Sequence, residues 1–490
     1  MIPEKDVPMP TLPPLRVSWR ALVWTSLFPA LASCGESDSA VDPGPTGPSA
    51  SVAITSGPSE VRQGDVVGYT AETRDAGGSL VADPTFAWSV SPASAGLIAE
   101  DGRFVGYTPG SAWVVATASG VGDSVAVTIT ARGLSGAFSV LGHREVLSHN
   151  SSHIAVHGTF AYTGTINCER SCGDRLFVWN VSDPANPTFS DLVVADGGNV
   201  NDIMVRADGA IAAMTHEGGG GGITILDLSD PAHPTVITRF TEGLEKGTHN
   251  LWIDGDFIYV AMGNFLDRTG LGLVVVDITN LQNPAVVASY KLGSADSHDV
   301  QVRDGLAVVS NWEAGLIILD VGGGGAGGSP ANAIELSRTR TPQGWTHNAW
   351  YWPATGYVFI GEEPQERFVV APTVYVMDAR DPSNPELVAA YSIPGFDPHN
   401  FWLDEDRGIL YVAWRGHGIR ALDMTGTLMG RLELQGRQIA GLTYDVGDCD
   451  TAFQAGLMGT GTCSLSVQVR DGLVYVSDKT SGLWVLQLQR

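Results

Sequence analysis

The sequence predicts an all-β protein, and three observations lead to that prediction. The chain holds 60 Gly and 27 Pro among 490 residues, with only 17% charged residues, which suits short strands and tight turns. Residues 248–292 read as four runs rich in β-branched and aromatic residues, each closed by Gly, Pro, Asn or Asp. Such runs recur along residues 136–490 at a period of about 45 to 50 residues, the signature of a β-propeller blade. We therefore expect a β-sandwich over residues 51–132 and a seven-bladed β-propeller over residues 136–490.

The charge of the chain narrows the choice of partners. The formal net charge is -25, with 53 acidic against 28 basic residues. Binding to phosphate backbones needs clustered Lys and Arg, and the chain offers no such cluster. Nucleic acid is therefore not expected as a partner.

Residues 1–33 have the pattern of a signal peptide. Arg16 and Arg20 precede an apolar run from Ala21 to Leu31, about half the roughly 20 residues needed to span a bilayer. The run ends in Leu-Ala-Ser-Cys at residues 31–34, which resembles the lipobox of bacterial lipoproteins. That resemblance implies cleavage before Cys34, a lipid on its thiol, and an exported protein anchored to a membrane of the bacterial envelope, at the outer membrane or cell surface. An ordinary signal peptide followed by an unmodified Cys is the alternative.

Residues 34–50 are rich in Gly, Pro, Ser and Asp and cannot bury apolar surface, so we expect a flexible tether. Six alternating runs between residues 51 and 132 then predict a β-sandwich. The motifs Phe-Ala-Trp-Ser at 86–89 and Pro-Gly-Ser-Ala at 109–112 resemble group 2 bacterial Ig-like domains. The resemblance implies a spacer, and we expect Trp88 and Trp113 to lie in its core.

The third strand of each propeller repeat is a continuous apolar run, as expected for a sheet covered on both faces. Seven copies occur, at residues 175–180, 222–227, 272–277, 315–320, 373–378, 418–423 and 482–487. Turn motifs such as Asp-Pro-Ala-Asn-Pro at 183–187 follow several of them. The Gly-Leu-x-Val-x-Asp strand followed by this turn resembles the LVIVD repeat family, which implies a propeller and leaves the activity open.

The two ends of the repeat region predict how the ring closes. Residues 136–144 precede any first strand and read as an isolated fourth strand, whereas the last repeat supplies strands one to three and no fourth. We expect these segments to form one blade, because closure removes the open sheet edges.

Four consecutive first strands begin with a His at the same point of the repeat. These residues are His249, His298, His347 and His399, at spacings of 49, 49 and 52. First strands lie nearest a propeller axis, so four imidazoles can ring the central channel, a set suited to Fe, Cu or Zn. Structural hydrogen bonding and a metal-free ligand site are the alternatives, and the cofactor, if any, is left open.

Loops at the ends of second strands emerge on the same face as these His residues, because the strands are antiparallel. This face gathers acidic, aromatic and basic candidates: Glu217, Glu313, Glu362, Trp312, Trp414 and Arg415. Four His backed by acidic residues in a seven-bladed propeller resembles carotenoid-cleaving oxygenases in architecture alone. No nucleophile elbow, zinc-protease motif or phosphate-binding loop occurs, so no catalytic residue is assigned.

Two functions remain open. The first is a lipid-anchored interaction protein whose propeller face binds a protein, a glycan or a small ligand. The second is a metal-dependent redox enzyme centred on the four His residues. Export also predicts disulfides among Cys168, Cys172, Cys449 and Cys463, with local pairing of 168 with 172 and 449 with 463 preferred to cross-pairing or a four-Cys zinc site.

Overall fold

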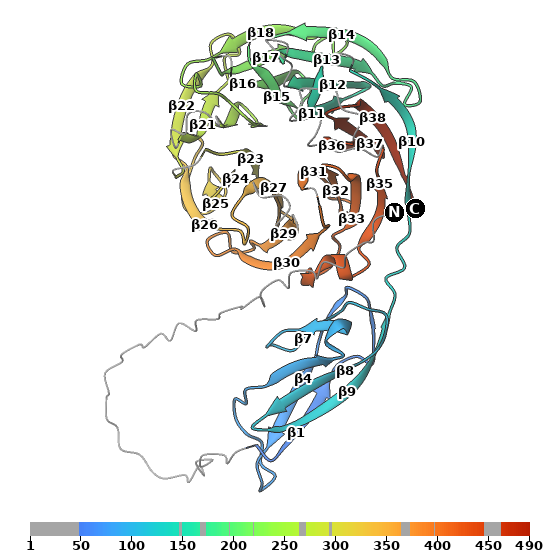
Figure 1. Cartoon of the computed structure of the whole chain (residues 1–490). Coiled ribbons are helices and arrows are strands. Elements are labelled where there is room, and N and C mark those ends of the chain that lie inside the picture. The colour runs from blue at the N-terminus through green and yellow to red at the C-terminus, as the bar shows by residue number, and fades with distance from the viewer. Residues whose placement is uncertain are drawn as a thin grey trace, which may run out of the picture. The chain divides into compact units, whose positions relative to one another are not determined.

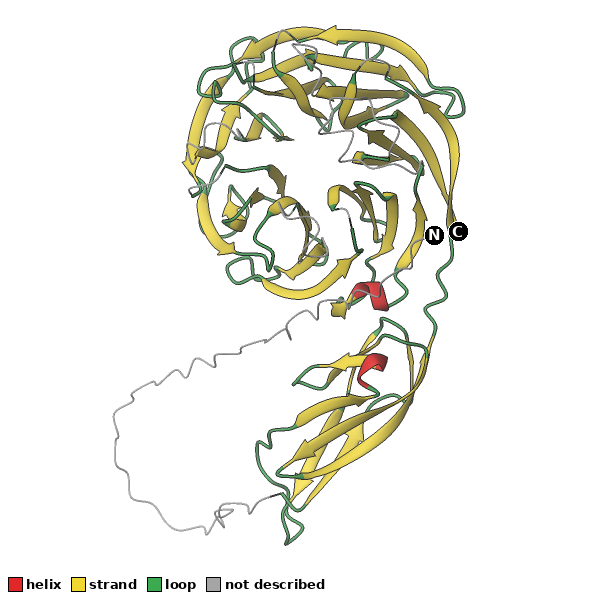
Figure 2. Ribbon diagram, viewed as in Figure 1, coloured by secondary structure: helices red, strands yellow, loops and turns green. Residues whose placement is uncertain are grey.

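The computed structural model describes residues 49–146, 149–166, 173–195, 197–218, 220–263, 271–293, 296–363, 373–395, 397–444 and 462–490. Cys34 and the expected signal peptide lie outside these residues. The described residues form strands and two 3-10 turns, η1 (Ala93–Ala95) and η2 (Leu432–Leu434), as Figure 2 shows. None of their helices is long and apolar enough to cross a membrane.

The N-terminal part is a small β domain with its own core. Its strands form three sheets: β1 (Ser51–Ser56) with β4 (Thr70–Arg74); β2 (Glu60–Arg62), β9 (Val121–Thr130), β8 (Gly110–Ala118) and β5 (Ala87–Ser91); and β3 (Val66–Gly68), β7 (Arg103–Gly106) and β6 (Gly96–Ile98). Phe104, Val114 and Ile129 are fully buried between them or nearly so. Trp88 packs against this core, but the expectation for Trp113 is wrong, since Trp113 is 51% exposed. Trp113 occupies one of the solvent-facing positions of a strand whose alternate residues are buried.

Seven sheets of the described residues make up the rest, six with four strands and one with five. The first sheet contains β11 (Asn150–His157), β12 (Phe160–Ile166), β13 (Arg175–Asn180) and β14 (Thr188–Val194), and the second contains β15 (Asn199–Val205), β16 (Ile211–Glu217), β17 (Ile223–Asp227) and β18 (Thr235–Phe240). The third contains β19 (Leu251–Asp254), β20 (Phe257–Ala261), β21 (Leu271–Asp277) and β22 (Ala285–Lys291). The fourth contains β23 (Asp299–Arg303), β24 (Leu306–Asn311), β25 (Gly315–Asp320) and β26 (Ile334–Thr339). We number these blades 1 to 4.

The remaining sheets are blades 5 to 7. They comprise β27 (Thr346–Trp352), β28 (Tyr357–Glu362), β29 (Thr373–Asp378) and β30 (Glu386–Ser392), extended by β34 (Gly430–Arg431); β31 (Pro398–Asp404), β32 (Ile409–Trp414), β33 (Gly418–Asp423) and β35 (Gln438–Leu442); and β36 (Ser464–Arg470), β37 (Leu473–Asp478), β38 (Gly482–Gln489) and β10 (Ala137–Arg144). The first strand of each blade lies towards the centre of the ring and the fourth at its rim (Figure 1).

The ring is closed as the sequence predicts. The first strands contact one another in turn through β11, β15, β19, β23, β27, β31 and β36, and β36 contacts β11. In blade 7 the N-terminal strand β10 pairs antiparallel with the C-terminal strand β38, with Phe138 opposite Leu488. The expected pairing of residues 136–144 with the last strand is therefore confirmed, and the β-propeller has no open seam between its ends.

The inner edge of each blade needs hydrogen-bond partners, because first strands have no neighbour on the axial side. Side chains of the preceding blade supply several of them. The Asp202 carboxylate accepts a hydrogen bond from Leu251 N at 2.9 Å, and Gln301 Oε1 accepts one from Tyr351 N at 2.6 Å. Polar residues near the axis thus have a structural role in joining blade to blade.

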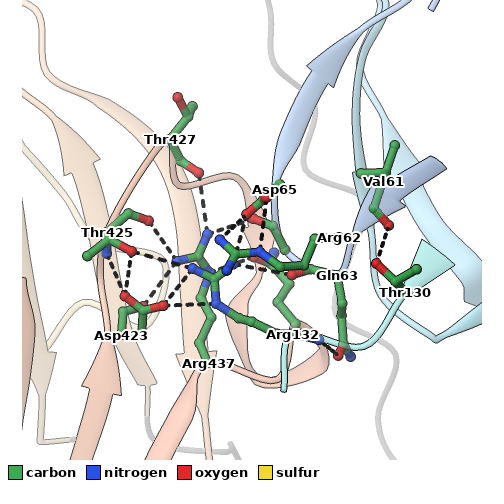
Figure 3. Close-up of polar contacts among 12 residues, drawn as sticks. Val61, Arg62, Gln63, Asp65, Thr130, Arg132, Asp423, Thr425, Thr427 and Arg437 are labelled. Carbon is green, nitrogen blue, oxygen red and sulfur yellow. Dashed lines mark hydrogen bonds and ion pairs between the residues drawn. The ribbon is translucent and has the colours of Figure 1, made fainter. Parts of the chain in front are cut away.

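The β domain and the propeller are joined by a buried polar cluster (Figure 3). Arg132 donates to Asp423 Oδ2 through Nε at 2.9 Å and through Nη2 at 2.6 Å, and its side chain is 1% exposed. Arg437 donates to Gly64 O at 2.7 Å, so each of the two parts sends an Arg into this cluster. Burial, followed by the charge of Arg132, lowers the pKa of Arg437 to about 10.

Cys463 is the one cysteine that falls within the described residues, and it is disulfide-bonded. Cys168, Cys172 and Cys449 lie outside those residues. The pairing therefore stays a prediction.

Candidate metal centre

The four His residues predicted from the repeat spacing come together at the propeller axis. Ring centroids lie 4.0 Å apart for His249 and His298, 3.8 Å for His298 and His347, and 4.4 Å for His347 and His399. All four side chains are buried or nearly so. The rings therefore form one continuous cluster and do not point into separate spaces between blades.

The local backbone explains why these rings face the axis. Side chains of a regular blade strand point towards the adjacent blades, but the pairing register shifts between Thr346 and Asn348, where His347 lies. A similar shift between Pro398 and Phe401 brackets His399. Such bulges re-aim a side chain. His249 and His298 achieve the same result by lying just before β19 and β23 begin.

Two of the imidazoles have one ring nitrogen held by an acceptor, and a third lies beside a carboxylate. His249 Nδ1 lies 3.0 Å from Glu217 Oε1, and His347 Nε2 lies 3.1 Å from Glu363 Oε2. His399 Nδ1 lies 2.7 Å from Leu465 O. A carboxylate or carbonyl that accepts from one nitrogen leaves the lone pair on the other, which is how metal-binding His residues are usually oriented.

His298 lies between His249 and His347 in the row of ring contacts, and its surroundings differ from theirs. Its Nδ1 atom is buried with no hydrogen-bond partner among the described residues. Trp312, a sequence-predicted candidate, packs against the ring at a centroid distance of 4.8 Å. Trp312 adopts a φ of 30°, an unfavourable conformation for a large residue, which places its ring over the cluster.

Burial keeps two of the imidazoles neutral. It lowers the pKa of His298 well below its usual value, and the neighbouring His249 and His347 add to that effect. It does the same for His399, with help from His347. Burial also lowers the pKa of His249, but the Glu217 carboxylate outweighs it and the net shift is upward. Neutral imidazole is the form that binds a metal ion.

Glu363 completes the group of possible ligands. One donor atom from each of His298, His347 and Glu363 lies within 4.8 Å of the others. Burial favours the protonated acid, but the Arg415 guanidinium and His347 outweigh it, so the pKa of Glu363 lies well below its usual value. Arg415 also pairs with Asp397, so its guanidinium is shared between two buried carboxylates.

Several sequence-predicted candidates lie elsewhere. Trp414 is fully buried in the hydrophobic core between blades 5 and 6, so its assignment to the face is wrong. Glu362 is buried, which raises its pKa to about 7, and it is the next residue, Glu363, that reaches His347. Arg415 is buried and ion-paired. Glu313 is partly exposed next to Trp312 in the chain.

His153 was missed by the sequence reasoning. It comes from blade 1, where Ser152-His153 is shifted by one position relative to Thr248-His249, so the spacing of the other four does not include it. His153 Nδ1 lies 2.6 Å from Asp202 Oδ1, and its ring contacts that of His399 at 6.5 Å. It occupies the repeat position of Asn250, one residue after the His position, and a comparison that included this position would have found it.

Comparison with known proteins finds a match to one repeat model. A model described as the LVIVD repeat matches residues 197–242 and 247–291. The chain contains LVIVD repeats. Each matched LVIVD repeat coincides with one blade, the first with β15 to β18 and the second with β19 to β22. The second LVIVD repeat contains His249.

Among curated proteins no sequence matches the chain. Two solved structures show similarity at 10% sequence identity. A β-propeller domain of Myceliophteria thermophila Cps50 (Swd1) has a TM-score of 0.49, covering 72% of this chain and 99% of its own. The computationally designed Ika8 protein has a TM-score of 0.45, covering 71% of this chain and 99% of its own. The fold assignment rests on the strand pairing and not on these similarities.

Proposed function

We propose that the propeller binds one transition-metal ion through the imidazoles at its axis. The observation that carries the proposal is the convergence of His249, His298, His347 and His399, from four consecutive blades, into one buried cluster. Of the two functions that the sequence left open, this geometry favours the metal-dependent one. Imidazole suits Fe, Cu and Zn, and the acceptors behind His249 and His399 match the second shell that such sites need.

The chemistry of the centre follows from the groups around it. His298 and His347 supply the imidazole ligands closest to one another, and the ionised Glu363 lies beside them. With Fe or Cu bound, the centre would support electron transfer to or from a small molecule at the face that carries Glu217 and Trp312.

The remainder of the proposal concerns location. We propose that the mature protein begins at Cys34, carries a lipid there, and is held at a membrane of the bacterial envelope. The support is the lipobox-like sequence at the end of the apolar run. Radioactive palmitate should label the wild-type protein and not Cys34→Ser, and label retained in the variant would refute the anchor.

Elemental analysis tests the metal proposal. Protein purified without chelators should hold close to one equivalent of Fe, Cu or Zn per chain. His298→Ala and His347→Ala should each lose most of it, whereas His233→Ala, an exposed His on a rim turn, should retain it. A wild-type protein that binds none of these metals, even after reconstitution, would leave only the interaction role.

A further inference from the structure

The propeller axis contains a second space, distinct from the His cluster. It is a cavity of about 240 Å³, and its lining includes His153, Asp202, Asn250, Asp299 and Trp350. Each of these residues comes from a first strand or, for Asn250, from the residue just before one, at or beyond the position that follows the His cluster along the chain. Because strands rise about 3.3 Å per residue, the cavity lies further along the axis, towards the opposite face of the ring.

A layer of hydrogen-bonded polar side chains separates the cavity from the His cluster. His153 Nδ1 donates to Asp202 at 2.6 Å, Asn250 Nδ2 donates to Asp299 Oδ1 at 3.0 Å, and Asn400 Nδ2 donates to the His153 ring. These residues occupy the same position in five of the blades, one residue after the His cluster. They form the floor of the cavity.

Three tryptophans form one wall. Trp252, Trp350 and Trp402 each lie three residues after a His of the metal cluster, and their rings touch edge to face at 6.3 and 5.2 Å. Blades 1 and 2 carry Ala155 and Met204 at the same position, so the opposite wall is less bulky. Trp252 and Trp402 are only half-buried, which leaves aromatic surface facing this space.

The charges around the cavity favour a neutral occupant. Both oxygens of Asp202 accept hydrogen bonds, from His153 and Leu251 N. Both oxygens of Asp299 do so as well, from Asn250 and Ala349 N. Each of these oxygens therefore already accepts a hydrogen bond, which partly offsets its attraction for a cation. Arg206, at the rim, is already held by Asp208.

The geometry points to a binding site for a single neutral sugar ring. Its apolar C–H face would lie on the tryptophan wall, and its hydroxyl groups, which both donate and accept, would suit the mixed Asn, Gln and His lining. The size agrees: 240 Å³ is the space of about eight waters at roughly 30 Å³ each, enough for one sugar ring.

Isothermal titration of the full chain with a panel of neutral hexoses and pentoses tests this inference, with choline as the cationic comparison. One equivalent of at least one sugar should bind saturably. Trp252→Met and Trp402→Met, which copy the residue of blade 2, should each weaken binding about tenfold, a loss near 1.4 kcal/mol. Trp113→Met, on the exposed face of β8, is the matched control and should bind as wild type.

Circular dichroism establishes that the variants are folded, and if one of the pair unfolds the other carries the comparison. No saturable sugar binding, equal binding by all variants, or Trp-dependent binding of choline in place of sugars would each overturn the inference. The titration counts sugar and not metal, so its failure leaves the metal proposal standing.

Discussion

His347 Nε2 lies 3.1 Å from Glu363 Oε2, and Glu363 is itself ion-paired with Arg415. This relay joins blades 5 and 6 above the axis and fixes one imidazole of the cluster in a single orientation. Burying an acid in this way has a free-energy cost, because its partners must be desolvated with it. Its purpose here, in our account, is to set the geometry of a metal ligand.

Glu363→Gln should weaken metal binding by about 10- to 100-fold, the usual cost of removing a group that orients a metal ligand. The amide keeps the shape of the side chain but loses the charge that holds His347. Competition with a chromophoric chelator measures the affinity. Glu335→Gln on the outer strand β26 is the control and should match wild type. Equal affinities for all three proteins would remove Glu363 from the site.

Arg132→Met should lower the free energy of unfolding by about 3 to 5 kcal/mol, the range for breaking a buried ion pair. Arg132 reaches Asp423 from the N-terminal domain, and its removal leaves that carboxylate without its main charged partner. Denaturant titration followed by circular dichroism gives the value. Adding Asp423→Asn should recover part of the loss, and a double variant less stable than the single one would contradict this account of the junction.

Asp320 gives a prediction about pH. Its carboxylate accepts main-chain N–H groups of Gly322, Gly324 and Gly328 in a glycine-rich loop, and these bonds hold the pKa of Asp320 below its usual value. A lowered folded-state pKa means that the stabilisation is full above the unfolded value, about 4, and is lost as pH falls through the folded one. Asp320→Asn should therefore melt well below wild type at pH 7.

The melting difference between wild type and Asp320→Asn should shrink steadily as pH is lowered from about 4. Asp227→Asn, at the matching position of blade 2 but held by Ser229 alone on the main chain, should show a smaller version of the same trend. Differential scanning calorimetry between pH 7 and 3 measures both. A difference that stays constant over this range would show that the loop does not depend on the charge of Asp320.

Peptide mapping of the non-reduced protein tests the cysteine pairing. Cys463 is disulfide-bonded, and the local assignment predicts a peptide that joins it to Cys449. Closing a loop of about 15 residues contributes roughly 3 kcal/mol in the chain-entropy model. A peptide that joins Cys463 to the region of Cys168 and Cys172 would show instead that the bond links blade 7 to blade 1.

The architecture could be predicted from the sequence because the blades recur at a regular period and share characteristic turn residues. The pairing of β10 with β38 follows from counting strands at the two ends, and the four His positions follow from their spacing. The prediction failed where a shift of one residue decides which way a side chain points. Glu362 and Glu363 are neighbours, yet only the second faces His347, and Trp414 ends a strand whose alternation turns it into the core. His153 was missed because it lies one repeat position after the other four His residues.

Anomalous X-ray diffraction from crystals of the protein loaded with Fe, Cu or Zn tests the central claim most directly. Our account predicts one strong peak at the absorption edge of the bound metal, on the propeller axis, about 2 Å from imidazole nitrogens of His298 and His347. The peak should vanish in His298→Ala. The absence of a peak at the axis of the loaded wild-type protein, or a peak held by residues outside the His cluster, would contradict the account.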